Sequence, residues 1–402
     1  MNFGDRIAAK APTALAVAAA WSCYSTLGLG YTVFLACLCS GAWHLQRTRG
    51  WGSTWRGAGY RAFAALWLLL LVSALWSPAP RGAIVAHLWT YSLVLLMPIS
   101  AAAWTPAAAR KALRHFIAAS AMVGALNAIQ YVGMLPDFDL WRRIVDAQGN
   151  QRIAVSLLLA LGAVLGLVEA LDSEPARRGR RVAWIGAALL CTAGLAAQDR
   201  RSGMLILPLL LIVLVFARER SVLRRVTLVA AIVLLGFAAW QVADGVRARF
   251  AEGFSELLAP RKATTVSTSW GQRLSMVEIT AGMVAERPLL GHGVASWRLL
   301  WEERTPVGSA LREHTTPHNE YLLVASQVGA VGLFLLLVGL AAVWRLAWNS
   351  GPTGTAALLA WTLLATSSLF NAMLRDAKFS LPLLTLAALA GIAGRSGSPP
   401  AR

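Results

Sequence analysis

Charge is scarce in this chain. Of its 402 residues, 57% are hydrophobic and only 14% are charged, whereas soluble globular proteins carry roughly 25% charged residues. The apolar residues are gathered in runs close to the ~20 residues that a helix needs to cross a bilayer. This composition excludes an ordinary soluble domain and predicts an integral membrane protein.

Acidic residues are scarcer than basic ones. The chain has 37 Lys and Arg against 19 Asp and Glu, a net charge of +18, and such an excess can indicate nucleic-acid binding. Here the basic residues stand in short clusters between apolar runs, which is the pattern of membrane topology rather than of a continuous basic face. We therefore expect the lipid bilayer as a partner and no nucleic acid.

Cysteine pairs and metal-binding patterns are also lacking. All four cysteines lie in apolar runs, without CxxC or Cys/His spacing, so neither a disulfide framework nor a zinc site is predicted. The sequence has no Walker loop, GxSxG elbow or HExxH motif. Asp137 and Asp139 are the nearest approach to a paired-carboxylate site, and carboxylates in a turn are more often solvated. We expect a mechanism without metal or cofactor.

The apolar runs predict an all-α, polytopic membrane protein with about twelve transmembrane helices. Arg6 and Lys10 precede an apolar stretch that resembles a cleavable signal, but we take it as an uncleaved first helix because many spans follow. The predicted spans are 10–25, 27–45, 59–76, 83–104, 112–134, 151–171, 180–198, 201–217, 224–243, 319–345, 353–372 and 376–394.

The distribution of Lys and Arg predicts the orientation, because cytoplasmic loops are enriched in these residues. Alternate loops are basic, so we expect both termini in the cytoplasm. The basic residues near the predicted cytoplasmic ends are Arg47, Arg49, Arg56, Arg110, Lys111, Arg177, Arg178, Arg180, Arg218, Arg220, Arg224, Arg345 and Arg395.

This orientation gives three regions. Residues 1–243 hold spans one to nine, 244–318 form a large periplasmic loop, and 319–402 hold spans ten to twelve with a cytoplasmic tail. The loop is nearly neutral, with nine basic and eight acidic residues. Its apolar spacing predicts an amphipathic helix from about 271 to 286, which Pro288 limits. Gly291-His292-Gly293 is typical of a turn.

Ionisable residues are nearly absent from the middle of the predicted spans, which argues against a proton-coupled transporter. Charges instead gather at the outer boundary, at Arg200, Arg201, Arg273 and Arg375. Arginines there could simply snorkel to the interface. Alternatively they bind an anion, because guanidinium groups fork onto phosphate oxygens.

His318 directly precedes Asn319 and the tenth predicted span. A histidine at a helix start is commonly structural. However, the positive end of a helix dipole lowers the pKa of an imidazole. A neutral histidine at this position would be a candidate general base.

Three blocks of this sequence resemble one family. Thr316-Pro317-His318-Asn319-Glu320-Tyr321-Leu322, followed by Gly329-Ala330-Val331-Gly332-Leu333, resembles the His-Asn-x-x-Leu block of O-antigen ligases and O-antigen polymerases. Arg273 with Pro288 and Gly291-x-Gly293 is similar to the family's Arg…Pro-x-x-Gly-x-Gly segment. Arg201-Ser202-Gly203-Met204-Leu205 is similar to its Arg-x-x-x-Leu block. Asp199 stands where the family often has Ser, which leaves open whether Arg200 or Arg201 has the role; we favour Arg201.

The resemblance covers roughly residues 196–335 and implies a glycosyltransferase without cofactor. The donor would be a polysaccharide on undecaprenyl pyrophosphate, and the acceptor a sugar hydroxyl of lipid A–core. His318, Arg273 and Arg201 would be catalytic, and Arg200, Arg375, Asn319 and Tyr321 would bind substrate. We expect an O-antigen ligase; an O-antigen polymerase, a protein O-oligosaccharyltransferase and a transporter of lipid-linked glycans are the alternatives.

Overall fold

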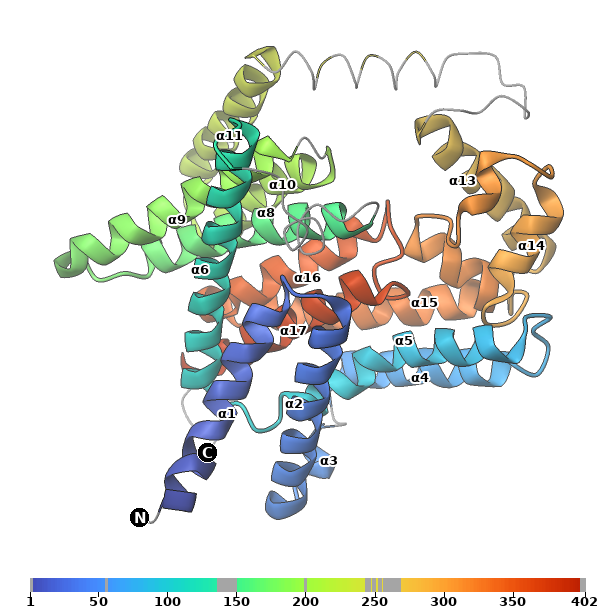
Figure 1. The fold of residues 1–402 in the computed structure, drawn as a ribbon, viewed down its shortest axis with the longest axis horizontal. Helices are drawn as coiled ribbons and strands as arrows, with labels where there is room; N and C mark the ends of the chain where they lie inside the picture. Colours follow the sequence, from blue (N-terminus) through green and yellow to red (C-terminus); the bar gives the residue numbers. More distant parts are fainter. Residues whose placement is uncertain are drawn as a thin grey trace.

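The protein is all-α (Figure 1). A computed structural model describes residues 3–54, 57–135, 150–198, 201–242 and 269–397, together with 247, 251 and 255. Within these ranges the chain forms helices and turns without a strand. Asp137, Asp139, Asp199 and Arg200 lie outside the described residues.

The helices follow one another along the whole chain. In the first half they are α1 (Phe3–Ser22), α2 (Leu27–Thr48), α3 (Trp51–Thr54), α4 (Ala58–Ser73), α5 (Arg81–Ser100), α6 (Pro106–Tyr131), α8 (Asn150–Leu171) and α9 (Arg178–Ala197). In the second half they are α10 (Arg201–Arg218), α11 (Val222–Val242), α13 (Ser269–Glu286), α14 (Ser296–Arg304), α15 (Glu320–Asn349), α16 (Thr355–Ser367) and α17 (Ala377–Ala393). Short 3-10 helices are η1 (Pro175–Arg177), η2 (Ala310–Glu313), η3 (Gly351–Gly354) and η4 (Gly394–Gly397).

Each of the twelve predicted spans coincides with a helix, which confirms a polytopic, all-helical membrane protein. Among the described residues, six helices are long and apolar enough to cross a membrane: α2, α5, α6, α8, α9 and α15. The helices α4 and α17 and most of α10 are apolar but shorter. The orientation in the membrane and the exact number of crossings stay predictions.

Several helix boundaries differ from the sequence prediction, and two of them are informative. The predicted start at 112 moves to Pro106, because Thr105 is an N-cap whose Oγ1 accepts a hydrogen bond from Ala108 N at 3.2 Å, and proline is favoured at the first helical position. The predicted end at 372 moves back to Ser367. Residues 368–376 form turns instead, and they carry polar side chains of the candidate site.

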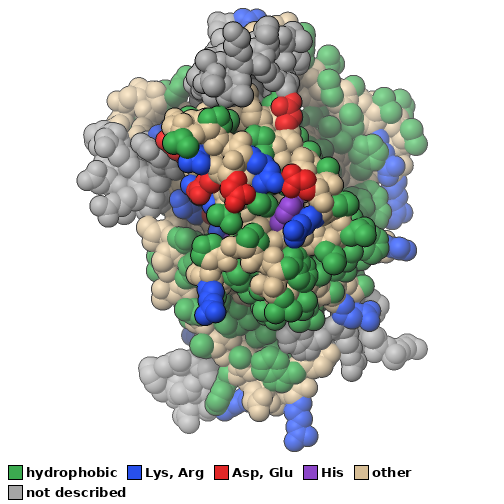
Figure 2. Space-filling view, turned by 90° about the vertical axis from the view of Figure 1, so that its right-hand side faces the viewer, with side chains coloured by type: hydrophobic (Ala, Val, Ile, Leu, Met, Phe, Trp, Pro, Cys, Tyr) green, Lys and Arg blue, Asp and Glu red, His purple; other side chains and the backbone are tan. Residues whose placement is uncertain are grey.

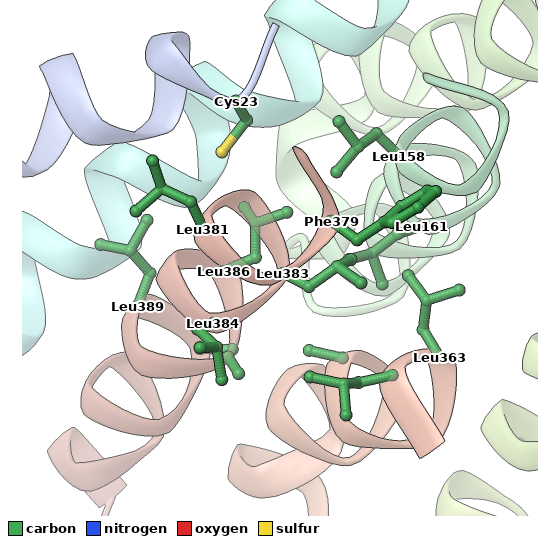
Figure 3. Close-up of a cluster of buried hydrophobic side chains, with 14 of the residues drawn as sticks. Cys23, Leu158, Leu161, Leu363, Phe379, Leu381, Leu383, Leu384, Leu386 and Leu389 are labelled. Atoms are coloured by element: carbon green, nitrogen blue, oxygen red, sulfur yellow. The ribbon is translucent and has the colours of Figure 1, made fainter. Parts of the chain in front are cut away.

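The main core surrounds α17, whose leucines are buried on all sides (Figure 3). Leu381, Leu383 and Leu384 are each at most 5% exposed. They lie among Leu158 and Leu161 of α8, Leu363 of α16 and Cys23 after α1. A helix that is apolar all round is one that other helices enclose, so α17 is a central element of the bundle.

Small residues let other helices of the bundle touch backbone to backbone. A Cβ atom added at Gly194 of α9 would lie 2.2 Å from the Cα of Gly124 in α6. Close approach at small residues is the usual way in which membrane helices pack.

The helices α13 and α14 lie at the end of the bundle where α4 turns into α5 (Figure 1). Ser77, in that turn, donates from Oγ to Val294 O at 2.6 Å, and Val294 N donates to Ser73 Oγ at 2.9 Å. The predicted amphipathic helix 271–286 is confirmed as α13, which ends at Glu286 as expected.

A second small core holds α13, α14 and the start of α15 together. The rings of Trp297 and Trp301 stack at 5.0 Å, and Trp297 Nε1 donates to Thr280 Oγ1 at 2.9 Å. Around them lie Met276, Met283, Leu300, Leu311, Leu323 and Ala372. The outer face carries charges of both signs around a histidine (Figure 2), including the ion pairs Arg304–Glu286 and Arg298–Glu302.

Candidate active site

A break in α15 joins two of the sequence blocks. Val328 and Gly329 leave helical geometry there, which frees backbone groups that a continuous helix would pair. His292 N and Gly293 N donate to the carbonyls of Ser326 and Gln327 at 3.0 and 2.8 Å. In return Ala330 N donates to Pro288 O at 2.7 Å. Backbone within a membrane protein must be satisfied internally, so the turn after α13 and the break in α15 stabilise each other.

Glycine is required at this crossing for two reasons. Gly329 has a φ of +65° and Gly291 a φ of +63°, a region that side chains with a Cβ rarely adopt. A Cβ at Gly329 would also lie 2.1 Å from Leu289 O, and one at Gly291 would lie 2.4 Å from the carbonyl carbon of Gln327. The glycines of the two blocks therefore let two backbones meet.

His318 lies immediately before α15 in an unusual backbone conformation. Its φ is +47°, a value uncommon for any residue other than glycine. The next residue, Asn319, is the N-cap: its Oδ1 accepts from Leu322 N and its Nδ2 donates to Leu369 O, both at 2.9 Å. Tyr321 donates from its hydroxyl to Ala365 O at 2.7 Å. The neighbours of His318 thus fix it to the turn that follows α16.

The imidazole of His318 is held between two side chains. Its Nδ1 lies 2.9 Å from Asn371 Oδ1, and its Nε2 lies 3.4 Å from Nδ1 of His314. The two rings meet edge to face at 83° with centroids 5.3 Å apart. His314 in turn places Nε2 3.2 Å from Gln272 Oε1 of α13. An amide oxygen that accepts from Nδ1 leaves Nε2 of His318 as the basic nitrogen.

The surroundings favour the neutral imidazole. Burial lowers the pKa of His318, and the positive charge of Arg273 lowers it further, although the hydrogen bond that His318 donates to Asn371 acts in the opposite direction. Burial also lowers the pKa of His314, and Arg273 and Arg298 add to this effect against Glu313. The positive charge of Arg273 therefore acts on both rings. Because a lower pKa favours the neutral imidazole, His318 is able to accept a proton.

Two residues after His318, the carboxylate of Glu320 is completely buried. It accepts hydrogen bonds from the hydroxyl of Tyr91 in α5, from Leu374 N at 2.8 Å and from Arg375 N at 3.3 Å. Its own backbone N–H donates to Ser368 O at 2.8 Å. Buried carboxylates persist only when hydrogen bonds compensate for lost solvation, and these bonds hold the 368–376 turns against α15.

Arg375 belongs to the same polar cluster. Its Nε donates to the ring of buried His87 at 3.0 Å. Gln327 places Nε2 3.3 Å from His87 Nε2 and accepts from Ala295 N at 2.9 Å through Oε1. The cluster thus connects the turn that carries Asn371 to the glycine-rich turn near α14.

The predicted site residues are partly brought together. The charge of Arg273 acts on His318 at the N-terminal end of α15, and Asn319 and Tyr321 flank the histidine. Arg375 lies in the 368–376 turns beside Glu320. Arg201 is the first residue of α10. Close packing of Gly203 fixes the backbone there, since a Cβ on Gly203 would lie 2.6 Å from Ser156 O of α8.

Sequence reasoning missed several polar residues of this region. His314 has a local signal, since it stands four residues before His318 in the same segment. No local signal marks the other residues, because each lies within or beside an apolar run and its hydrogen-bond partner is far along the chain. These residues are Asn371, Glu320, Tyr91 and His87.

The comparisons with known proteins agree with this geometry. Residues 186–337 match the family model described as O-antigen ligase. The match runs from α9 into α15 and includes Arg201, Arg273 and His318, whereas Asn371 and Arg375 lie beyond it. No curated protein matches the chain. Residues 186–337 are thus similar to an O-antigen ligase domain, which is consistent with the O-antigen ligase and polymerase family of membrane proteins.

Proposed function

We propose that this protein is an O-antigen ligase. It transfers a polysaccharide from undecaprenyl pyrophosphate to a sugar hydroxyl of lipid A–core, on the periplasmic side of the inner membrane. The observation that carries the proposal is an imidazole that is oriented by an amide and influenced by an arginine: His318 is hydrogen-bonded to Asn371, and the charge of Arg273 lowers its pKa.

The reaction needs a base because a sugar hydroxyl is a poor nucleophile until its proton leaves. His318 Nε2 takes that proton while the acceptor oxygen forms a bond to the anomeric carbon of the donor. The bond from that carbon to the pyrophosphate oxygen breaks, and its electron pair leaves with the lipid pyrophosphate. Direct displacement inverts the anomeric configuration.

Positive charge assists the departure of the pyrophosphate. Arg273 and Arg201 hold its oxygens and stabilise the negative charge that develops there. Arg200 and Arg375 are further candidates for contact with the anion, and Asn319 and Tyr321 for contact with the substrates. Arginine supplies this charge without a divalent ion, so transfer should continue when EDTA is present.

Purified protein with both lipid substrates tests the proposal directly. We expect the lipid A–core to gain the polymer in one step, seen as a shift to low mobility on a gel, and the lipid pyrophosphate to accumulate. An inverted linkage at the anomeric carbon is the second readout. The proposal fails if the protein releases no lipid pyrophosphate with the acceptor present, or if EDTA abolishes transfer.

A deletion strain separates ligase from polymerase. Loss of all O-antigen from lipid A–core, with polymer retained on the lipid carrier, is the expected outcome. A core that carries a single repeat unit would instead identify a polymerase. Normal lipopolysaccharide with unmodified pilin would identify a protein O-oligosaccharyltransferase, and glycan trapped on the cytoplasmic side would identify a transporter.

A further inference from the structure

Two imidazoles, rather than one, meet before α15. His318 Nε2 lies 3.4 Å from His314 Nδ1. The outer nitrogen of each ring faces an amide oxygen: Asn371 Oδ1 lies 2.9 Å from His318 Nδ1, and Gln272 Oε1 lies 3.2 Å from His314 Nε2. Amide oxygens only accept, so both outer nitrogens carry hydrogen and donate. In the neutral pair, both inner nitrogens therefore present lone pairs toward the same place.

The two inner nitrogens can share one proton. Two facing lone pairs repel each other, and a proton between them replaces that repulsion with an N–H···N hydrogen bond. Groups that interact this closely bind protons as a pair, with the first proton held more readily and the second resisted. A single imidazole in this buried setting beside Arg273 would be a weak base, and a general base works best when its pKa is near the operating pH.

We propose that His314 and His318 act together as one base, in which His314 Nδ1 shares the proton that His318 Nε2 takes. His314 is a positioning residue, because it acts on the reaction through His318. The identity of the proton donor, a sugar hydroxyl, rests on the proposed function, whereas the shared proton does not. During transfer the hydroxyl O–H bond breaks and its electron pair forms the new C–O bond. The proton remains between the two rings until solvent removes it.

Four charged groups face the pair from different elements. They are Arg273 of α13, Arg298 of α14, Glu313 of η2 and Asp376 before α17. Arg298 also fixes the backbone beneath one ring, since its Nη1 donates to His314 O at 2.6 Å. All four remain in place when only the side chain at 314 is changed, so differences between variants at 314 report the ring nitrogen itself.

The shared proton can be measured without substrate. Full-length protein with 15N-labelled histidine is titrated by NMR, with His318→Gln used to assign the signals. We expect His314 and His318 to take up one proton together. His314→Phe keeps an aromatic ring but removes both nitrogens, so His318 should then be protonated only at lower pH. His314→Asn places an oxygen acceptor near the position of Nδ1, so the pH at which His318 is protonated should return part of the way to its wild-type value.

Activity gives the second readout. His314→Phe should transfer ~3- to 10-fold more slowly at neutral pH, because a weaker base accelerates the step less, with the acid limb of its pH profile moved downward. His314→Asn should recover part of both effects. Independent titration of the two rings, hydrogen on His314 Nδ1 in the neutral state, or slower transfer without movement of the acid limb would each overturn the proposal. Coupled titration in a protein that transfers no glycan would refute the proposed function but would still support the proton shared by His314 and His318.

Discussion

The centre of the bundle and the N-terminal half of α15 are built in opposite ways. Around α17, buried leucines from several helices pack against one another through apolar contacts (Figure 3). At the N-terminal half of α15, buried Glu320, His87 and Gln327 are hydrogen-bonded to partners on other elements. Apolar packing tolerates many arrangements of similar volume, whereas a buried polar group needs one particular partner. The first region therefore supports the fold, and the second specifies the site.

The sharpest way to test this division is to remove one side chain from each region. His318→Ala should fold and bind the lipid-linked donor, yet lose ~10²- to 10⁴-fold in transfer rate, because a positioned base contributes about this much. Leu161→Ala in the core should lower the free energy of unfolding by ~2–5 kcal/mol while each folded molecule keeps its rate. Initial rates normalised to folded protein, with thermal unfolding in detergent, distinguish the two. A His318→Ala protein with full activity would remove the general base from the mechanism.

The next largest effect is expected at the arginines. Arg273→Ala and Arg201→Ala should each lose ~10²- to 10³-fold in rate, since one charge-assisted contact to a developing anion contributes ~3–4 kcal/mol to transition-state stabilisation. Lysine should rescue only partly, because it cannot make the two-pronged contact. Arg247→Ala is the matched control outside the proposed site. Wild-type rates in either variant, at equal expression, would refute the assignment for that arginine.

Gly329→Ala tests the crossing between the break in α15 and the turn after α13. Its positive φ and the carbonyl of Leu289 at 2.1 Å from an added Cβ leave no room for a methyl group, so stability should fall by ~1–3 kcal/mol or more. Gly391→Ala, in the helix α17, meets nothing within 4 Å and should be neutral or slightly stabilising. Thermal unfolding midpoints in the same detergent provide the measurement. Equal midpoints for both variants would show that the crossing at Gly329 is not constrained.

A smaller effect is expected for Glu320→Gln. The amide keeps one acceptor oxygen but points two hydrogens into a site that holds the donors of Tyr91, Leu374 and Arg375. We expect a loss of ~1–3 kcal/mol in stability, with a reduced rate because the turn that carries Asn371 shifts. Glu303→Gln on the exposed side of α14 should change stability by less than ~0.5 kcal/mol. If both variants behave alike, the buried carboxylate does not hold the site together.

The same division explains what the sequence could predict. Hydropathy correctly predicted a helix at each proposed span and the helix α13, because the bilayer imposes length and apolarity on each segment separately. The motif residues Arg273 and His318 also stand out in the sequence, and the charge of Arg273 acts on the ring of His318 in the structure. Asn371 was placed inside a span, since nothing in an apolar run reveals that its helix ends at Ser367. Glu320 and His87 depend on partners more than 200 residues away, which no local pattern contains.

The smallest effect concerns pH. His318 must be neutral to accept a proton, and burial together with Arg273 lowers its pKa from the ordinary value of 6.5. The neutral form therefore persists to lower pH than for a free imidazole, and transfer should fall only as the pH drops below 6.5. Asp376 acts in the opposite direction, since its negative charge raises the pKa of His318. Asp376→Asn keeps a side chain suited to cap α17 and should move the acid limb slightly further down. Rates measured from pH 5 to 8 in wild type and Asp376→Asn provide the test. An upward movement of the acid limb in the variant would mean that another group limits the rate.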